Sequence, residues 1–370
     1  MSRRFDELPG LIEAKLGEHA RVVLIYFDAF GWRFLERHAD HPLFAGAEIE
    51  RWSSCFPSTT TVHSTTIHSG LPVGEHGLYE WNVFEPRLNR LVTPLWFCFA
   101  GDERPGTLLD AGFTAHDLFP EQTLYRRLLP VPSHIAMPAG IAHSQTSQVL
   151  LREATVHPFE GTGEGLARLC GALAAEERAY GSIYFGDADA LMHMAGPDAP
   201  EVAALMEEHL SAIAVAPWPE GTLVLLTADH GMEGISPERT TYVNVVWPEL
   251  AQHLAVGADG KPLAPAGSCR DLFLHVLPER LDEVEARLAE LLTGVAEVRT
   301  VEALLAEGLF GPNITEALTS RLANLVVLPA PGEAAYWLEP GRFEQRFLGQ
   351  HGGLSANEME IPLVSWIAGD

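Results

Sequence analysis

Three aspartates and three histidines stand at positions of the sequence from which they could bind metal ions. They follow short apolar runs or lie in a glycine-rich segment, and they are Asp28, Asp189, His193, Asp229, His230 and His351. Mixed carboxylate and imidazole ligands suit Zn²⁺, and less strongly Mn²⁺ or Fe²⁺, better than Mg²⁺ or Ca²⁺, which prefer oxygen ligands alone. A site with two transition-metal ions is therefore the leading hypothesis.

Each of these residues also has an ordinary structural interpretation. Asp28 at a strand end is typical of a helix N-cap or a turn. Asp189 and His193 stand four residues apart, which on a helix puts them on one face, where they could form a surface ion pair or share a metal ion. Because all six recur at strand ends or beside glycines, their combination favours the metal site.

The segment Cys55–His63 adds a nucleophile to this set. Pro57 ends an extended piece, and the hydroxyl residues that follow it indicate the N-terminus of a helix. Such an end offers free N–H groups and a positive dipole to an anion. A hydroxyl there can attack phosphorus if a metal ion lowers its pKa, although at least one of these hydroxyls is expected only to cap the helix.

A parallel α/β sheet is predicted to position these residues. Continuous apolar runs indicate fully buried strands at Val22–Phe27, Ser182–Phe185 and Leu223–Thr227, with helices at Gly31–Ala39, Thr162–Ala179 and Glu201–Ala214. Ligands of open α/β sheets bind beyond the carboxyl ends of the strands. The aspartates that follow these strands are therefore expected at such a site.

Two regions interrupt this α/β pattern. Residues 85–160 are rich in proline and aromatic residues, and we expect them to cap the sheet. In residues 269–344 strands and helices alternate again, which predicts a small inserted α+β subdomain. Its strands are expected at 271–276, 297–300 and 324–328, and its helices at 281–292 and 301–307. The catalytic domain then comprises residues 1–268 and 345–370, with a last strand at Ile361–Ile367.

Composition excludes several classes of protein. The 370 residues are 47% hydrophobic and 20% charged, which is typical of a packed globular chain and not of a disordered one. A formal charge of −26 disfavours binding to nucleic acid or to a membrane surface. The first residues lack an apolar stretch and no segment is typical of a membrane span, so we expect a cytoplasmic protein. The four scattered cysteines are predicted to be reduced and mostly buried.

Five motifs together resemble the type I phosphodiesterase/nucleotide pyrophosphatase family of the alkaline phosphatase superfamily. Phe56–Gly77 is similar to the family's nucleophile segment, which places the nucleophilic threonine on Thr60 and puts His63 where the family has an asparagine that holds a phosphoryl oxygen. The other four motifs match at Asp28, at Asp189 with His193, Gly196 and Pro197, at Asp229–Met232, and at His351 with Gly352.

This resemblance implies an alkaline-phosphatase-like fold and a division of the ligands between two divalent ions, Zn²⁺ or alternatively Mn²⁺. One ion would be held by Asp189, His193 and His351, and the other by Asp28, Asp229 and His230 together with Thr60. Thr60 would attack a small phosphate ester or nucleotide and form a phosphothreonine intermediate, with His63 as a second catalytic residue. Because 55–77 contains no Lys or Arg, phosphodiesters or nucleotide pyrophosphate bonds are expected to react faster than monoesters.

Three alternatives remain open from the sequence. A phosphomonoesterase or phosphomutase of the same fold would need basic groups such as Arg126 and Arg127. A sulfatase would use Cys55, but Thr59 stands where an arginine is required. A non-catalytic metal-binding protein would have no chemical need for Thr60 beside the ligands. The substrate groups are expected to meet the inserted regions, where the candidates for stacking or packing are Tyr79, Trp81 and Trp96.

Overall fold

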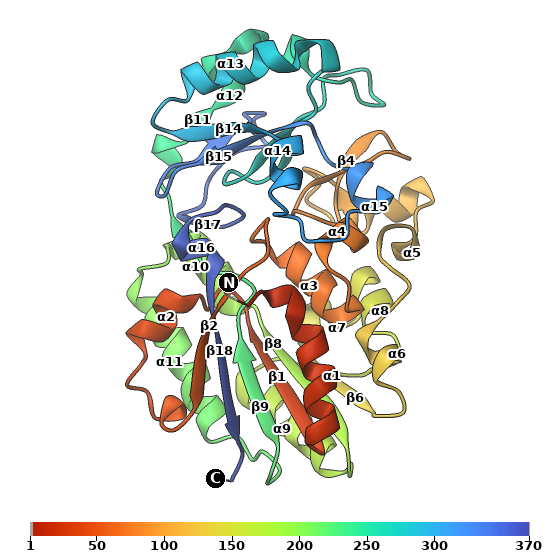
Figure 1. Cartoon of the computed structure of the whole chain (residues 1–370), viewed down its shortest axis with the longest axis vertical. Coiled ribbons are helices and arrows are strands. Elements are labelled where there is room, and N and C mark those ends of the chain that lie inside the picture. Colours follow the sequence, from red (N-terminus) through yellow and green to blue (C-terminus); the bar gives the residue numbers. More distant parts are fainter. Residues whose placement is uncertain (1–2, 370) are drawn as a thin grey trace.

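The computed structural model describes residues 3–369, and a seven-stranded sheet dominates the described part of the chain (Figure 1). Its order is β2-β18-β9-β1-β8-β6-β7, and only β18 runs antiparallel to its neighbours. The strands are β2 (Glu48–Ser53), β18 (Glu360–Ile367), β9 (Leu223–Thr227), β1 (Arg21–Phe27), β8 (Ala179–Phe185), β6 (Ser133–Pro138) and β7 (Thr155–Phe159). The predicted mostly parallel sheet is confirmed.

The central strands are buried on both faces, as their continuous apolar sequences predict. Every residue of β1 after Arg21 is buried, and β1 pairs in parallel with β8 through Val22 and Tyr180 and with β9 through Val22 and Leu223. Because β1, β8 and β9 share one direction and one register, their carboxyl ends meet at the same edge of the sheet. The candidate ligands follow these ends.

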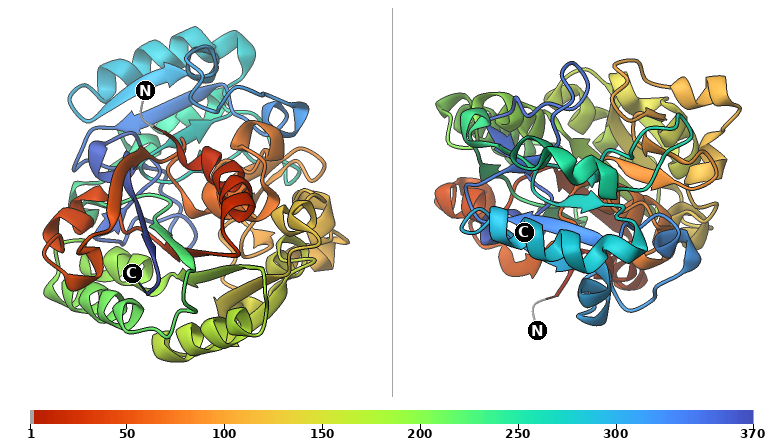
Figure 2. Two further views of the ribbon diagram at one scale, coloured as in Figure 1. Left: turned by 60° about the horizontal axis from the view of Figure 1, so that its bottom comes forward. Right: turned by 90° about the horizontal axis from the view of Figure 1, so that it is seen from above.

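Helices cover both faces of the sheet. In the left view of Figure 2, α1 lies on one side, and α9 and α11 lie on the other. The main helices next to this sheet and its site are α1 (Leu8–Glu18), α2 (Trp32–Arg37), α3 (Thr60–Ser69), α9 (Thr162–Ala174), α10 (Asp187–Ala195) and α11 (Pro200–Ala214). A continuous hydrophobic core fills the space between these helices and the sheet.

A second, antiparallel sheet lies beyond the carboxyl edge of the first, at the top of Figure 1. Its order is β12-β13-β15-β14, and α13 packs on β14. The elements are β12 (Ala266–Gly267), β13 (Leu272–Leu274), α13 (Leu281–Leu291), β14 (Ala296–Thr300), α14 (Val301–Ala306) and β15 (Leu325–Pro329). From β13 to β15 the order strand, helix, strand, helix, strand is the one predicted for the inserted subdomain. The strand β12 was not predicted and lies before residue 269, and the limits of 269 and 344 stay a prediction.

Shorter elements join these two sheets. Small sheets pair β3 (Val83–Glu85), β4 (Arg90–Thr93) and β5 (Cys98–Phe99), then β10 (Glu233–Gly234) with β17 (Gly349–Gln350), and β11 (Thr241–Tyr242) with β16 (Ala335–Tyr336). The short helices are α4 (Val73–His76), α5 (Ala115–Leu118), α6 (Leu124–Leu128), α7 (Ala139–Ala142), α8 (Gln145–Leu150), α12 (Val243–Val246), α15 (Glu316–Thr319) and α16 (Ala356–Met359).

Two expectations need correction. Part of the region predicted only to cap the sheet builds it instead, because β6 and β7 are strands at its edge. Their His and Pro residues at 134, 157 and 158 break the apolar pattern by which a strand is recognised. The helix predicted to reach Ala179 ends at Ala174, and Ala179 begins β8, since the chain must turn back to enter the sheet.

The cysteines and the helices agree with the remaining sequence-based expectations about packing. All four cysteines are free and buried. None of the helices in residues 3–369 combines the length and the apolar character that crossing a bilayer requires.

Candidate metal centre

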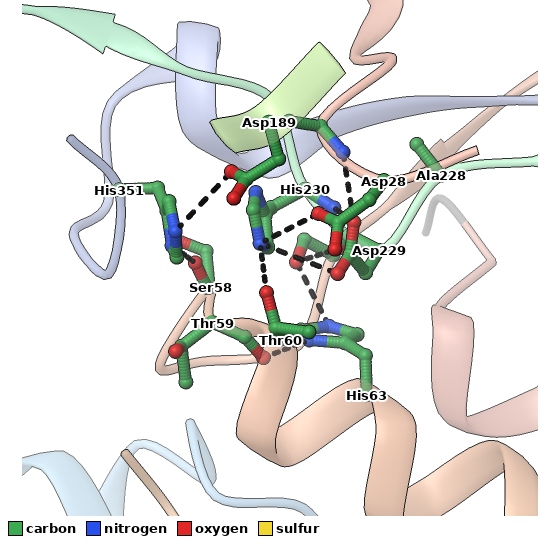
Figure 3. A network of polar contacts seen from close by, with 12 residues as sticks. Asp28, Ser58, Thr59, Thr60, His63, Asp189, Ala228, Asp229, His230 and His351 are labelled. Carbon is green, nitrogen blue, oxygen red and sulfur yellow. Dashed lines mark hydrogen bonds and ion pairs between the residues drawn. The ribbon is translucent and has the colours of Figure 1, made fainter. Parts of the chain in front are cut away.

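The candidate ligands converge at the carboxyl edge of the large sheet (Figure 3). Asp28 follows β1, and the pair Asp229 and His230 follows β9. Asp189 lies in the first turn of α10, directly after β8, and His351 follows β17. Segments that are more than 300 residues apart in the chain therefore supply one cluster of side chains.

Three of these residues form a group around the Nε2 atom of His230. Ligand atoms of Asp28, Asp229 and His230 lie within 4.8 Å of one another. The His230 Nε2 atom is 3.6 Å from Asp28 Oδ1 and 3.3 Å from Asp229 Oδ2. The same nitrogen is 3.2 Å from the Oγ1 atom of Thr60. The predicted nucleophile thus lies beside this group.

A second group surrounds the carboxylate of Asp189. Ligand atoms of Asp189, His230 and His351 lie within 4.8 Å of one another. Asp189 Oδ1 is 3.6 Å from His351 Nε2, and Asp189 Oδ2 is 3.4 Å from His193 Nε2. The rings of His230 and His351 stack with centroids 3.7 Å apart, so the two groups adjoin.

The candidate ligands His193, His230 and His351 all direct the Nε2 atom toward the centre. The Nδ1 atom of each lies within hydrogen-bond distance of a backbone carbonyl: Gly231 O at 2.9 Å from His230, Gly349 O at 2.8 Å from His193, and Ser58 O at 2.9 Å from His351. A carbonyl can only accept, so Nδ1 carries the proton and Nε2 keeps its lone pair for a ligand. Such an arrangement is typical of histidines that bind metal ions.

Burial shifts the pKa values of the candidate ligands and so determines their protonation. The pKa of His230 is lowered to about 4 and that of His351 to about 3, chiefly by burial, so both rings are neutral near pH 7. Burial, reinforced by the Asp229 carboxylate, raises the pKa of Asp28 well above its usual range. The Oδ1 atoms of Asp28 and Asp189 are buried and accept no hydrogen bond from described residues. Neutral imidazoles and unpartnered carboxylate oxygens fit divalent metal ions.

Two tyrosines that the sequence analysis did not identify orient the carboxylates. Tyr26 donates a hydrogen bond of 3.0 Å to Asp229 Oδ2, and Tyr184 donates one to Asp28 Oδ2. The backbone N–H of Ala29 donates to Asp229 Oδ1 at 3.1 Å, and Ala29 has a φ of 59°. Alternate residues of a strand share a face, so a tyrosine two positions before Asp28 was a signal available in the sequence.

Burial distinguishes Thr60 from the other hydroxyl residues at the start of α3. Thr60 is the first residue of α3, and its side chain is partly exposed, whereas Ser58, Thr59 and Thr61 are buried. Ser58 is tied to the loop after His351, because its Oγ donates to Gly353 O at 2.8 Å. The expectation that one of these hydroxyls caps the helix is wrong, because no side chain among the described residues caps the N-terminus of α3. Thr60 is therefore the hydroxyl of this run that faces both the ligands and an open space.

His63 has a different setting from the one the resemblance implied. Its Nδ1 atom donates to Thr59 O at 2.7 Å, and its Nε2 atom accepts from Cys55 N–H at 3.0 Å. Burial lowers the pKa of His63 to about 4. With both nitrogens engaged and the ring neutral, His63 has no free donor for a phosphoryl oxygen, and it instead joins α3 to the preceding segment.

A cavity of about 610 Å³ adjoins the centre, with Asp28, Thr60 and Asp189 in its wall. Trp81 and Trp96 also line it, whereas Tyr79 is fully buried and packs on Phe273.

Comparison with known proteins identifies relatives of this chain. Residues 22–354 match the model of the family described as type I phosphodiesterase/nucleotide pyrophosphatase. No curated protein sequence matches. Among solved structures, murine ectonucleotide pyrophosphatase/phosphodiesterase 5 is 18% identical with a TM-score of 0.64, covering 93% of this chain and 87% of its own; an inactive variant of it was solved in complex with AMP. Phosphonoacetate hydrolase from Sinorhizobium meliloti 1021, in complex with phosphonoformate, is 15% identical with a TM-score of 0.65, covering 94% and 90%.

Proposed function

The chain belongs to the type I phosphodiesterase/nucleotide pyrophosphatase family and is a hydrolase of phosphoric ester or phosphoanhydride bonds, and from this premise we propose that it hydrolyses phosphodiesters with Thr60 as the nucleophile. The observation that carries the proposal is the position of Thr60 Oγ1. It lies 3.2 Å from His230 Nε2, at the start of α3 and in the wall of a cavity.

The family is metal-dependent, and we assign two divalent ions, Zn²⁺ in the first instance, to the two groups of ligands. Asp28, Asp229 and His230 would hold one ion beside Thr60. The second ion would be held by Asp189 and His351 of the second group and by His193, whose Nε2 atom lies 3.4 Å from Asp189 Oδ2. In this assignment His230, which the geometry places in both groups, binds the first ion. When bound, the ions would supply Lewis-acid stabilisation of the charged oxygens at the reacting phosphorus.

The residues of the chain provide the other requirements of the reaction. The Thr60 hydroxyl gives up its proton to solvent and its oxygen forms a bond to phosphorus as the bond to the leaving alcohol breaks, and that alcohol takes a proton from solvent. The phosphothreonine formed still carries the second ester group. Water then adds to phosphorus, the bond from phosphorus to Thr60 breaks, Thr60 regains its proton, and a phosphate monoester is released. The uncapped N–H groups at the start of α3, which has ten residues, can donate to the anionic oxygens. His63 acts as a positioning residue, because it fixes Thr59, the neighbour of Thr60.

Among the described residues that line the cavity there is no lysine or arginine, and this supports a diester rather than a monoester. A monoester dianion carries more charge than a diester monoanion and calls for added positive groups. Arg127, one of the two arginines considered in the sequence, pairs with Glu13 at 2.6 Å and donates to Gly70 O at 2.9 Å. Neither Arg126 nor Arg127 lines the cavity. The charge at the site therefore suits a monoanionic substrate.

A direct comparison of two chromogenic substrates tests this proposal. Protein loaded with Zn²⁺, or with Mn²⁺ in a parallel preparation, is assayed with bis(p-nitrophenyl) phosphate and p-nitrophenyl phosphate. We expect a higher kcat/KM for the diester and two metal ions per chain by elemental analysis. A clear preference for the monoester overturns the diesterase proposal, and full activity in a strong chelator overturns the assignment of the metal ions.

A further inference from the structure

The cavity beside the candidate metal centre has a wall that the proposed reaction does not explain. One part of its lining is Asp28, Thr60 and Asp189, which belong to the candidate centre. The other wall is formed by Trp81, by residues from 95–109 and by the segment of α7 and α8. At about 610 Å³, the cavity is large enough for an organic group of moderate size in addition to a phosphoryl group.

This wall exposes large apolar side chains. Trp81 is 36% exposed, Trp96 46%, Leu109 45% and Ile141 41%, and all four line the cavity. The rings of Trp81 and Trp96 meet edge to face with centroids 5.7 Å apart. Single exposed apolar residues are common on protein surfaces, but four that converge on one cavity beside a reactive hydroxyl indicate a surface that a ligand covers. Covering them removes apolar area from water, which favours binding.

The lining of the cavity offers no lysine or arginine to an anionic group. Among the described residues that line it there is no Lys or Arg, and the carboxylates are those of Asp28 and Asp189. Two histidines line it: burial lowers the pKa of His68 to about 4, so its ring is neutral near pH 7, and His143 is exposed. A second phosphate or a carboxylate in this cavity would leave water without gaining a lysine or arginine partner, and the chain as a whole has a formal charge of −26.

We propose that the substrate is a phosphodiester whose group in this cavity is uncharged and largely apolar, an aryl or alkyl alcohol rather than a polyphosphate. The inference rests on the proposed function and deepens it, because it separates two activities that the family name joins. The exposed apolar side chains provide affinity for the organic group, and the absence of Lys and Arg from the described lining discriminates against a phosphoanhydride substrate with further phosphates beyond the reacting one.

Phosphonates that cannot be hydrolysed at this centre test the cavity without relying on turnover. Binding of methylphosphonate, phenylphosphonate, propylphosphonate and 2-carboxyethylphosphonate to metal-loaded protein is measured by calorimetry. The last two have similar length and differ in a terminal charge. We expect phenylphosphonate to bind about tenfold more tightly than methylphosphonate, and propylphosphonate about tenfold more tightly than its carboxylated counterpart.

Matched variants locate the effect. Trp96→Ala and Leu109→Ala are each expected to reduce the preference for phenylphosphonate over methylphosphonate severalfold. Leu129→Ala is the control, because Leu129 is 57% exposed and does not line the cavity, and it should leave the preference unchanged. Either cavity variant suffices if the other does not fold.

The outcomes separate this inference from the proposed function. Equal binding of propylphosphonate and 2-carboxyethylphosphonate, or a preference for phenylphosphonate that survives both cavity variants, overturns the apolar assignment even if bis(p-nitrophenyl) phosphate is hydrolysed. The expected binding preferences without hydrolysis of the diester support the apolar cavity and overturn the phosphodiesterase proposal instead.

Discussion

Removing the metal ions should lower the thermal stability of the protein by an amount that can be worked out in advance. Asp28 and Asp229 are 1% and 0% exposed, and Asp28 has an oxygen that no described residue hydrogen-bonds. Oxygens of both carboxylates lie within 3.6 Å of His230 Nε2, so a bound cation would give these buried groups a positively charged partner. The proposed ions would bind the folded chain more tightly than the unfolded one, because the unfolded chain does not bring the ligands together, and their binding energy would therefore add to stability.

The size of the effect follows from mass action. An ion present at a thousand times its dissociation constant adds about 4 kcal/mol to the free energy of unfolding. At about 2.1 cal/mol/K per residue, a chain of 370 residues unfolds with an entropy of about 0.8 kcal/mol/K. Each ion should then raise Tm by about 5 °C, and both together by about 10 °C.

Calorimetry with and without a chelator measures this shift. Asp28→Asn and Asp189→Asn each remove one ligand from a different group and should each abolish about half of the shift. Asp198→Asn is the control, because Asp198 is an exposed aspartate paired with Arg37. A metal-induced shift below about 1 °C, or a full shift in both ligand variants, would refute the two-ion assignment.

Three further predictions concern other parts of the fold. Thr60→Ala should fold normally and lose about a thousandfold in kcat, equivalent to about 4 kcal/mol, while Ser58→Ala should lose less than about tenfold. A larger loss of kcat in Ser58→Ala than in Thr60→Ala in a diester assay would refute the choice of nucleophile. Burial raises the pKa of Glu80 from 4.5 to about 8. The free energy of unfolding should therefore fall by up to about 1.4 kcal/mol per pH unit as the pH rises between these values. Glu80→Gln should reduce this pH dependence of the free energy in urea unfolding. Arg270 and Glu358 form a fully buried ion pair of two 2.9 Å bonds, so Arg270→Met should cost about 3–5 kcal/mol in the same unfolding measurement, and a loss below 1 kcal/mol would contradict this.

The direction of the pH dependence predicted for Glu80 follows from the surroundings of its carboxyl group. Its carboxyl group is buried beside Asp271, whose pKa is also raised by burial and by Glu80 itself. The neighbouring Arg270 is paired with Glu358 and does not neutralise them. A carboxyl whose pKa is higher in the folded chain stabilises the fold while it is protonated, so the stability it contributes is lost on going from the pKa of the unfolded chain to that of the folded one.

The strands that carry the site could be predicted because their sequences have one interpretation. The runs before Asp28 and Asp229 are apolar on both faces, and only a strand buried in a sheet accommodates them. The strand β7, in contrast, places His157 and Pro158 at the edge of the sheet, where a missing N–H is tolerated, and its sequence therefore resembles a loop.

Within the site, residue types could be predicted better than contacts. Asp28 and Asp189 follow strands directly, so their meeting follows from the parallel order of β1 and β8. The setting of His63 could not be predicted, since it depends on Cys55 N–H approaching its ring after the chain turns into α3. Tyr184 reaches Asp28 from a strand 156 residues later in the chain, and that contact depends on the register of β1 with β8.

Gly231 and Gly352, which follow the candidate ligands His230 and His351, explain why glycine stands next to the histidine in both motifs. A Cβ on Gly231 would lie 2.0 Å from the carbonyl oxygen of Asn357, and the same Gly231 supplies the carbonyl that sets the protonation of His230. Gly352, next to His351, has a φ of 125°, and a Cβ there would lie 2.7 Å from Asp271 Oδ1. Any side chain at either position would push the backbone away from its neighbour and turn the adjacent imidazole. These glycines therefore orient the candidate nitrogen ligands, although neither has a side chain with which to bind a metal ion.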